Sequence, residues 1–283
     1  MPELPDLEVI KDVLARRMAG AQIVSVHTLR PLIVRNLVGG EISEHLVGQT
    51  VDSVKRRGKF LLLTLSNGLS LVINPMLAGR LRFGEPLPKD RRRDALIISF
   101  ASGQELRYFD PKDMGKVYLT ENLGAVPGFD TMGPEANDPS LTVEIFAERL
   151  SVYRGEIKSI LTRQDFVAGI GTAYSDEILW RAGIYPYRRR TSLTSEEVRS
   201  VHEAIRSVLG KRSGFWQQGW ATRSRSSYGT SWASTAAADK RARGAGRVSA
   251  RFTAAARAPS SAGNASLAYS LTPGAACRSA ETT

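Results

Sequence analysis

The sequence contains a single cysteine, Cys277, among 283 residues. One cysteine cannot form a disulfide within the chain, and it cannot supply a zinc site that depends on cysteine ligands. We therefore expect neither a metal nor another cofactor. Long apolar runs are also missing, and the N-terminus has no basic leader followed by an apolar segment. These absences favour a soluble, cytoplasmic protein that does not bind membranes.

Acidic residues are scarce only near the C-terminus. The formal net charge is +11, which by itself suggests a nucleic-acid partner. Eleven of the 39 basic residues lie after residue 210, where Asp239 and Glu281 are the only acids. The remaining 28 basic and 26 acidic residues leave the first 210 residues almost neutral. An argument for DNA binding must therefore rest on individual residues.

The N-terminal part is predicted to contain one helix and many short strands. Apolar residues from Leu7 to Met18 recur at helical spacing. Short β-rich runs follow, and Asn67-Gly68 and Ser102-Gly103 indicate hairpin turns. The predicted strands are 23–26, 51–56, 60–65, 69–73, 96–100, 105–109 and 117–120. This pattern predicts a two-sheet β-sandwich with an N-terminal helix over residues 1–123, within an α+β fold.

A second, helical domain is predicted over residues 140–210. The segment 124–139 is rich in proline and glycine and is predicted to be a linker. The candidate helices are 143–150, 154–161, 173–182 and 195–209. Thr194 and Glu197 form a capping box at the start of the last one.

Residues 211–283 differ sharply from the rest. They contain no isoleucine or methionine, one valine and two leucines, and are dominated by alanine, serine, arginine, glycine and threonine. Such a composition cannot bury enough apolar surface to offset chain entropy, so we expect a disordered, low-complexity basic tail. The abrupt change also resembles an out-of-frame reading.

The first residues carry a chemical signal. After removal of Met1, Pro2 would present a secondary amine that can form an imine with an aldehyde carbon, and Glu3 would supply a carboxyl group beside it for proton transfer. Such a pair suits chemistry at the C1′ of a sugar. A dipeptide alone is weak evidence, because an unstructured chain start would look the same.

A series of further motifs resembles the formamidopyrimidine-DNA glycosylase and endonuclease VIII family, most closely its formamidopyrimidine-DNA glycosylase branch. The motifs are Met1-Pro2-Glu3-Leu4-Pro5-Asp6-Leu7-Glu8, Arg56-Arg57-Gly58-Lys59-Phe60-Leu61-Leu62, Ala78-Gly79-Arg80-Leu81, Asp110-Pro111-Lys112-Asp113-Met114-Gly115, Gly133-Pro134-Glu135, and the run from Val167 to Leu179 with Ala182-Gly183-Ile184-Tyr185-Pro186 behind it. The resemblance covers roughly residues 1–210 and implies a helix-two-turns-helix domain after the sandwich.

The resemblance implies three catalytic residues. Pro2 would attack C1′ of the damaged nucleotide, Glu3 would act as general acid and base, and Lys59 would grip a phosphate. Lys158 matches a second lysine near the target nucleotide. Without the motifs, both lysines would be read as ordinary solvated side chains.

The loop that opens a predicted helix at Gly169-Ile170-Gly171-Thr172 would bring backbone amides to a DNA phosphate. The family typically has asparagine where this chain has Thr172, which keeps a hydroxyl but loses the reach of an amide.

Relatives fill the gap left by an extruded nucleotide with methionine, arginine and phenylalanine. The matching residues here are Leu77, Lys112 and Met114. Lys112 cannot give the planar bidentate contact of arginine, so selectivity for the opposite base is in doubt. For Leu77 and Met114 the alternative is ordinary packing. Relatives also commonly carry a structural zinc on four cysteines, and these ligands are absent here.

The expected function is base-excision repair of damaged double-stranded DNA by a monomer that is associated with the nucleoid if the source is bacterial. It would release oxidised purines such as 8-oxoguanine and formamidopyrimidines, and would cut abasic sites through a proline Schiff base. The alternatives are an impaired or non-catalytic binder of damaged DNA, or a truncated remnant. An RNA-binding helix-two-turns-helix module is disfavoured because it would not need a terminal proline.

Overall fold

The computed structural model describes residues 1–90 and 94–223, with side chains as far as residue 210 in the last helix. Cys277 and most of the predicted tail lie outside these residues. Among the helices of the described part, none is both long and apolar enough to span a bilayer.

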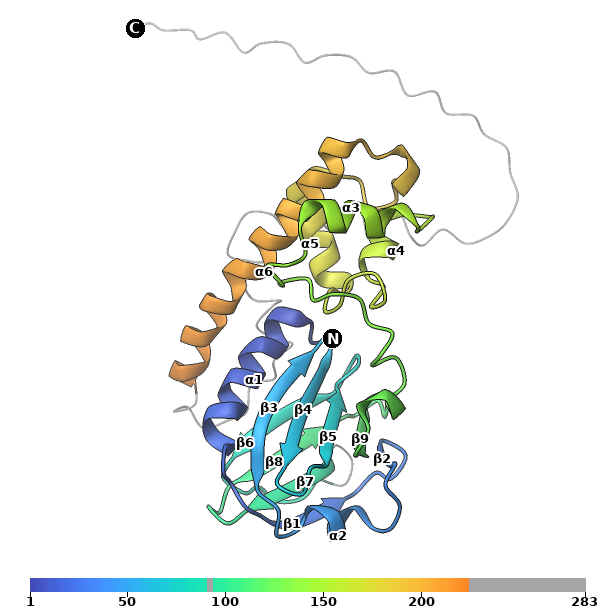
Figure 1. Cartoon of the computed structure of the whole chain (residues 1–283). Coiled ribbons are helices and arrows are strands. Elements are labelled where there is room, and N and C mark those ends of the chain that lie inside the picture. Colours follow the sequence, from blue (N-terminus) through green and yellow to red (C-terminus); the bar gives the residue numbers. More distant parts are fainter. Residues whose placement is uncertain (91–93, 224–283) are drawn as a thin grey trace, which may run out of the picture. The chain divides into compact units, whose positions relative to one another are not determined.

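Two β-sheets form the N-terminal part (Figure 1). The first is antiparallel and has the strand order β1 (Ile23–Thr28), β7 (Asp94–Phe100), β8 (Glu105–Phe109) and β6 (Arg80–Gly84). The second has the order β2 (Val34–Asn36), β9 (Lys116–Thr120), β5 (Ser70–Asn74), β4 (Phe60–Leu65) and β3 (Val51–Arg57). Only the β2–β9 pair in this sheet is parallel. The prediction of a two-sheet architecture is confirmed.

The predicted hairpin turns occur where glycine takes a left-handed backbone. Gly68 joins β4 to β5 with φ 83°, and Gly103 joins β7 to β8 with φ 80°. The strand β4 is buried on both faces: Leu61, Leu63 and Leu65 join the main apolar core, whereas Phe60 and Leu62 pack in a second cluster with Val126 and Met132. This second cluster fixes the linker against the sheet.

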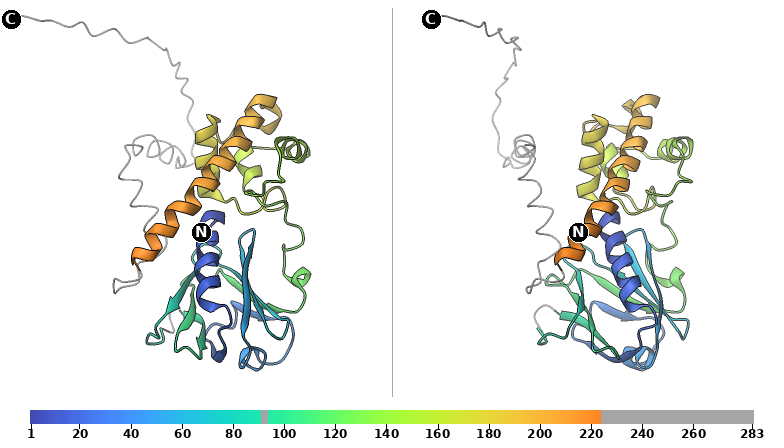
Figure 2. Two further views of the ribbon diagram at one scale, coloured as in Figure 1. Left: turned by 60° about the vertical axis from the view of Figure 1, so that its left-hand side comes forward. Right: turned by 90° about the vertical axis from the view of Figure 1, so that its left-hand side faces the viewer.

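Helix α1 (Leu4–Met18) belongs to two cores. Leu7, Leu14 and Met18 pack in the sandwich core, whereas Leu4 packs in the core of the helical region. The helix packs against β3 and against the last helix, α6 (Figure 2). The N-terminus of the chain is therefore held between two independently packed regions.

The helical region contains four α-helices: α3 (Val143–Ser151), α4 (Ile157–Leu161), α5 (Thr172–Ala182) and α6 (Ser195–Arg223). The predicted capping box is confirmed. The Thr194 Oγ1 accepts the Glu197 N–H at 3.2 Å, and the Glu197 carboxylate accepts the Thr194 N–H at 2.9 Å.

Some element boundaries differ from the prediction. Helix α4 starts at Ile157 and not at Arg154, because Gly155 has φ 111° and Glu156 is extended. Helix α6 continues past Leu209 and crosses the predicted domain boundary at residue 210, in a stretch that no proline interrupts.

Several short elements were not predicted. They are β2, β6, the helix α2 (Ile42–Leu46) and the 3-10 turns η1 (Leu123–Ala125) and η2 (Arg190–Ser192).

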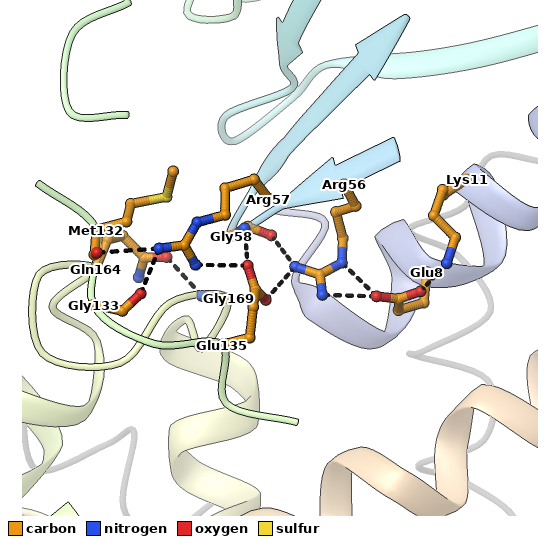
Figure 3. A network of polar contacts seen from close by, with 10 residues as sticks. All are labelled: Glu8, Lys11, Arg56, Arg57, Gly58, Met132, Gly133, Glu135, Gln164 and Gly169. Atoms are coloured by element: carbon orange, nitrogen blue, oxygen red, sulfur yellow. Dashed lines mark hydrogen bonds and ion pairs between the residues drawn. The ribbon is translucent and has the colours of Figure 1, made fainter. Parts of the chain in front are cut away.

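A polar network joins α1, the β3–β4 turn and the linker (Figure 3). The Glu135 carboxylate accepts hydrogen bonds from Arg56 Nη1 at 2.6 Å, Arg57 Nη1 at 2.9 Å and the Gly58 N–H at 2.6 Å. Arg56 also donates to Glu8 on α1 at 2.7 Å through Nε. A single carboxylate thus binds both arginines and the backbone of the turn.

The same network continues into the helical region. Arg57 donates to the carbonyl oxygens of Met132 at 3.1 Å and Gly133 at 2.7 Å. The Gly133 N–H donates to the Gln164 carbonyl at 2.8 Å, and the Gln164 side chain accepts the Gly169 N–H at 2.9 Å. The turn that follows β3 is therefore connected by hydrogen bonds to the loop that precedes α5.

Replacing Glu135 with alanine should destabilise the fold strongly. The Arg56 side chain is 4% exposed, and the change would remove its ion pair with residue 135 while the guanidinium stays buried. Breaking a buried pair costs about 3 to 5 kcal/mol, and we expect the lower end because Glu135 itself is 18% exposed and Arg56 keeps its ion pair with Glu8. The free energy of unfolding in urea measures the effect.

The matched control is Glu148→Ala, which removes an exposed carboxylate from α3. It should change the free energy of unfolding by less than about 0.5 kcal/mol. Equal midpoints for the two variants would contradict the role given to Glu135.

Candidate functional site

The Glu3 carboxylate lies at the N-terminal end of α5. It accepts hydrogen bonds from the backbone N–H groups of Gly171 at 2.7 Å, Ala173 at 2.9 Å and Tyr174 at 3.1 Å. These donors belong to the first turn of the helix, whose own N-cap residue, Gly171, has no side chain to cap it. A residue at the start of the chain thus supplies the anionic cap of a helix 168 residues away.

Two glycines make room for this contact. A Cβ on Gly171 would lie 2.5 Å from Cδ of Glu3, and a Cβ on Gly169 would lie 2.7 Å from Cδ1 of Leu4. Gly169 also has φ 97°, which other residues rarely adopt. The two glycines of the Gly-x-Gly pattern therefore allow Glu3 and Leu4 to pack closely against this loop.

The amides of these glycines already have partners. The Gly171 N–H donates to Glu3, and the Gly169 N–H donates to Gln164. The hydrogen bonds of Glu3 skip Thr172, which is exposed at the first position of the helix. The role of Gly169 and Gly171 in phosphate binding stays a prediction, and among the three loop residues Thr172 is the one best placed to meet a phosphate.

The backbone around Glu3 is also fixed. The Leu4 N–H donates to the Gly169 carbonyl at 3.0 Å, and the Asp6 carboxylate accepts the Glu3 N–H at 3.0 Å. Pro2 directly precedes this anchored segment and is half-buried, whereas Met1 is 43% exposed. Loss of Met1 would leave the Pro2 nitrogen as a terminus beside the Glu3 carboxylate.

Lys59 lies in the turn between β3 and β4. The preceding Gly58 has φ 54°, and a Cβ there would lie 2.5 Å from Sδ of Met132, so the turn requires glycine at this point. Lys59 is close enough to Glu3 for their charges to interact. Two segments of the chain thus place Glu3 and Lys59 within reach of each other's charge, and Pro2 directly precedes Glu3.

Burial dominates the electrostatics of Glu3 and Lys59. Burial raises the pKa of Glu3, although the hydrogen bonds from the three amides and the positive charge of Lys59 oppose the shift. Burial also lowers the pKa of Lys59, against the opposing effect of Glu3. The site therefore favours the neutral form of both groups more than water does, which suits a carboxyl that donates and accepts protons.

Lys158, the second predicted lysine, lies on α4 and forms an ion pair with Asp176 on α5 at 2.6 Å. Asp176 is four residues after Thr172 on the same helix. A DNA phosphate at Lys158 would have to compete with this carboxylate.

Leu77, Lys112 and Met114 lie in two loops of the sandwich. Leu77 lies between β5 and β6 and is 56% exposed. Lys112 is exposed and Met114 half-buried, both between β8 and β9. Within the residues that the structure describes, no group of histidine, cysteine, aspartate or glutamate could hold a metal ion.

Sequence reasoning missed the residues that support this site. Glu135, Arg56 and Gln164 hold the Lys59 turn and the Gly169 loop. The motifs Arg56-Arg57-Gly58 and Gly133-Pro134-Glu135 were visible in the sequence, but the pairing of their opposite charges was not.

The Glu3 carboxyl should titrate above pH 4.5, and further above it in Lys59→Met. Removal of the lysine charge removes an effect that lowers the pKa. Because the folded pKa is raised, the contribution of Glu3 to stability is present below pH 4.5 and is lost as the pH rises through the folded pKa. Carboxyl ¹³C NMR, assigned with Glu3→Gln, measures the midpoint.

The control is Lys55→Met on β3, which removes an exposed lysine that does not contribute to the shift of Glu3. Its midpoint should match the wild type. A wild-type midpoint at or below 4.5, or no change in Lys59→Met, would contradict this account of the electrostatics.

Comparison with known proteins finds relatives over most of the chain. The profile of the formamidopyrimidine-DNA glycosylase N-terminal domain matches residues 1–117, and that of the formamidopyrimidine-DNA glycosylase H2TH domain matches residues 132–218. The formamidopyrimidine-DNA glycosylase of Desulforamulus reducens is 37% identical over 213 residues, which are 74% of this chain and 76% of the relative. That of Moorella thermoacetica is 36% identical over 211 residues, which are 74% and 77% of the two chains.

A crystal structure of the Lactococcus lactis formamidopyrimidine-DNA glycosylase, non-covalently bound to DNA that contains an AP site, has the same fold. Its TM-score is 0.70 at 29% identity, and the match covers 78% of this chain and 85% of the other. The Pro2-Glu3 pair lies near the start of the chain, and the helical region binds the Glu3 carboxylate. Together with these likenesses, this contact shows that the chain belongs to the formamidopyrimidine-DNA glycosylase family.

Proposed function

We propose that this protein is a bifunctional DNA glycosylase and abasic-site lyase that removes oxidised purines from double-stranded DNA. The observation that carries the proposal is the anchoring of the N-terminus, because Glu3 is fixed by three amides of α5 while Pro2 stands directly before it. An unstructured chain start would not be held by a helix of another region. The protein would act as a monomer, in the cytoplasm and on nucleoid DNA if the source is bacterial.

The first chemical step forms a covalent bond to the sugar. The Pro2 nitrogen, in its neutral form, attacks C1′ of the damaged nucleotide with its lone pair. The bond between C1′ and the base breaks, and the base leaves with a proton that Glu3 supplies in its neutral form. The raised pKa of Glu3 supports this role, because it extends the pH range in which the carboxyl carries a proton.

Strand cutting follows from the same intermediate. The nitrogen then gives up its proton and the C1′–O4′ bond breaks, with a proton going to O4′. The proline nitrogen and C1′ now form an iminium ion, which is an electron sink and acidifies the C2′ hydrogens. The Glu3 carboxylate takes a C2′ proton, the electrons form a C2′–C3′ double bond, and the 3′ phosphate leaves. A second elimination releases the 5′ phosphate, and water then frees Pro2. Neither elimination needs a metal.

DNA would be held from both regions. Lys59 on the sandwich side and Thr172 with Lys158 on the helical side would contact phosphates around the extruded nucleotide. Leu77, Lys112 and Met114 would occupy the gap in the duplex. Related solved structures support such a partner, since the L. lactis protein was crystallised with DNA containing an abasic site and a mutant of it with DNA containing Fapy-dG.

Borohydride trapping tests the nucleophile. Wild-type protein without Met1 should form a covalent complex with an abasic duplex, because borohydride reduces an iminium ion. Pro2→Gly should lower the trapped fraction by about tenfold or more, since it changes the attacking amine. Gel electrophoresis measures the complex, and N-terminal mass spectrometry confirms that Met1 is absent.

Pro127→Ala serves as the control, because it changes an exposed proline of the linker. It should trap like the wild type. Absence of trapping by the wild type without Met1 would favour the alternative of a non-catalytic binder of damaged DNA.

Abasic-site cleavage should be better preserved than 8-oxoguanine release. Cleavage needs Pro2, Glu3 and a residue that binds a DNA phosphate. Release also needs a side chain that fills the gap in the duplex and contacts that bind the duplex firmly. Each weakened contact costs about 1 to 3 kcal/mol, so the changes at Lys112 and Thr172 together should slow release by orders of magnitude.

Single-turnover rates on matched duplexes decide the point, with the L. lactis enzyme as the reference. Equal loss of both activities relative to that enzyme, or loss of cleavage alone, would contradict the assignment.

A further inference from the structure

Two loops of the sandwich carry the predicted gap fillers, and both have an unusual backbone. Loop 75–79 joins β5 to β6 and carries Leu77, and loop 110–115 joins β8 to β9 and carries Met114. Met76 has φ 49° and Asp113 has φ 53°. Among residues 1–90 and 94–223, only these two non-glycine residues have positive φ. Each of them directly precedes an apolar gap filler, so both fillers follow a residue in a rarely populated conformation.

Local hydrogen bonds maintain these conformations. The Asn74 side chain accepts the Met76 N–H at 3.2 Å. The Asp110 carboxylate is fully buried and accepts the N–H groups of Lys112 and Gly115, while Arg30 binds Asp113. Each loop is therefore held in shape from within the sandwich.

The phenol of Tyr108 lies between the two loops. Tyr108 is on β8, is 1% exposed, and pairs with Leu81 of β6. A Cβ on Gly79 would lie 2.2 Å from the Tyr108 hydroxyl oxygen, and a Cβ on Gly115 only 1.7 Å from it. Both loop backbones thus rest on the same hydroxyl group.

This hydroxyl is anomalous as a purely structural group. It is buried, and it has no hydrogen-bond partner among the described residues. A buried hydroxyl without a partner lowers stability, so phenylalanine would pack here at less cost. What the hydroxyl does provide is bulk between Gly79 of one loop and Gly115 of the other.

We propose that Tyr108 is a positioning residue whose hydroxyl sets the spacing between loop 75–79 and loop 110–115. The spacing holds Leu77 and Met114 so that they enter the base stack together. The inference rests on the proposed function, because it concerns how the gap left by an extruded nucleotide is filled. It adds a residue that touches no DNA and acts only through the two glycines.

Tyr108→Phe separates positioning from stability. Loss of the unpaired hydroxyl should leave the melting temperature unchanged or raise it. Without the spacer the loops move toward each other, and a misplacement of this kind should lower 8-oxoguanine release by about tenfold or more. Cutting of a pre-formed abasic site should change by less than about threefold, because it depends less on gap filling.

Double variants test the contact itself. Gly115→Ala should impair release, and Gly115→Ala with Tyr108→Phe should recover a part of it, because the closest clash of the new Cβ is with the removed oxygen. Gly79→Ala is the matched control. Its Cβ would also lie 2.3 Å from the Pro75 carbonyl oxygen, so Tyr108→Phe should not rescue it.

The experiment uses the full chain without Met1 and a duplex with 2-aminopurine beside a tetrahydrofuran abasic-site analogue. Fluorescence reports unstacking on loop insertion, and single-turnover release of 8-oxoguanine is measured in parallel. We expect a clear fluorescence rise with the wild type, a smaller one with Tyr108→Phe, and partial recovery only in the Gly115 double variant.

Two outcomes would overturn the inference in different ways. A wild type with no fluorescence change and no release would overturn the proposed function together with this inference. A wild type that gives both signals, with Tyr108→Phe within about twofold of it in each, would leave the proposed function standing and remove Tyr108 from it.

Discussion

The hydrogen bonds between the Glu3 carboxylate and the first turn of α5 are the interaction on which the rest of the site depends. They satisfy helix amides that would otherwise lack partners, and they place an anion where the helix dipole favours it. Leu4 strengthens the attachment by packing in the helical core while the rest of α1 packs in the sandwich core. The start of the chain therefore connects two packed regions, and the path of its first residues is fixed.

Burial of the Glu3 carboxylate at this contact costs hydration energy, and the resulting pKa shift is chemically useful. A carboxylate that is 2% exposed loses hydration, and three amides and Lys59 compensate for only part of the loss, so its pKa stays raised. Lys59 loses hydration in the same place and its pKa falls. Each group lowers the cost of the other's charge, so a change at one alters the titration of both. Both shifts are toward the neutral form, the direction that brings a carboxyl and an amine closer to the pH range in which they exchange protons.

The supporting structure follows one pattern, in which a buried or half-buried polar side chain fixes a short loop. Glu135 holds the Gly58–Lys59 turn, Gln164 holds the loop before α5, and Asp110 holds the loop that carries Lys112 and Met114. Glycine stands where two of these loops meet a neighbour, because a Cβ would collide with Met132 at Gly58 and with Tyr108 at Gly115. These contacts with neighbouring side chains make the loops rigid. The same neighbouring side chains position the residues that the loops carry.

The amino-acid sequence alone predicts the two-sheet and helical architecture, the hairpin turns at Gly68 and Gly103, the Thr194 cap and the likeness to a glycosylase family. These follow from local rules, since apolar periodicity, turn glycines and capping residues act over a few positions. It did not determine the short elements β2, β6 and α2, whose formation depends on neighbours far along the chain. Three contacts are visible only in the folded chain. Gly169 and Gly171 make room for Leu4 and Glu3, Glu135 binds two arginines, and Lys158 pairs with Asp176. Such contacts join residues many positions apart, and no periodicity or spacing in the chain encodes which distant groups will meet, because that depends on how the packed regions come together.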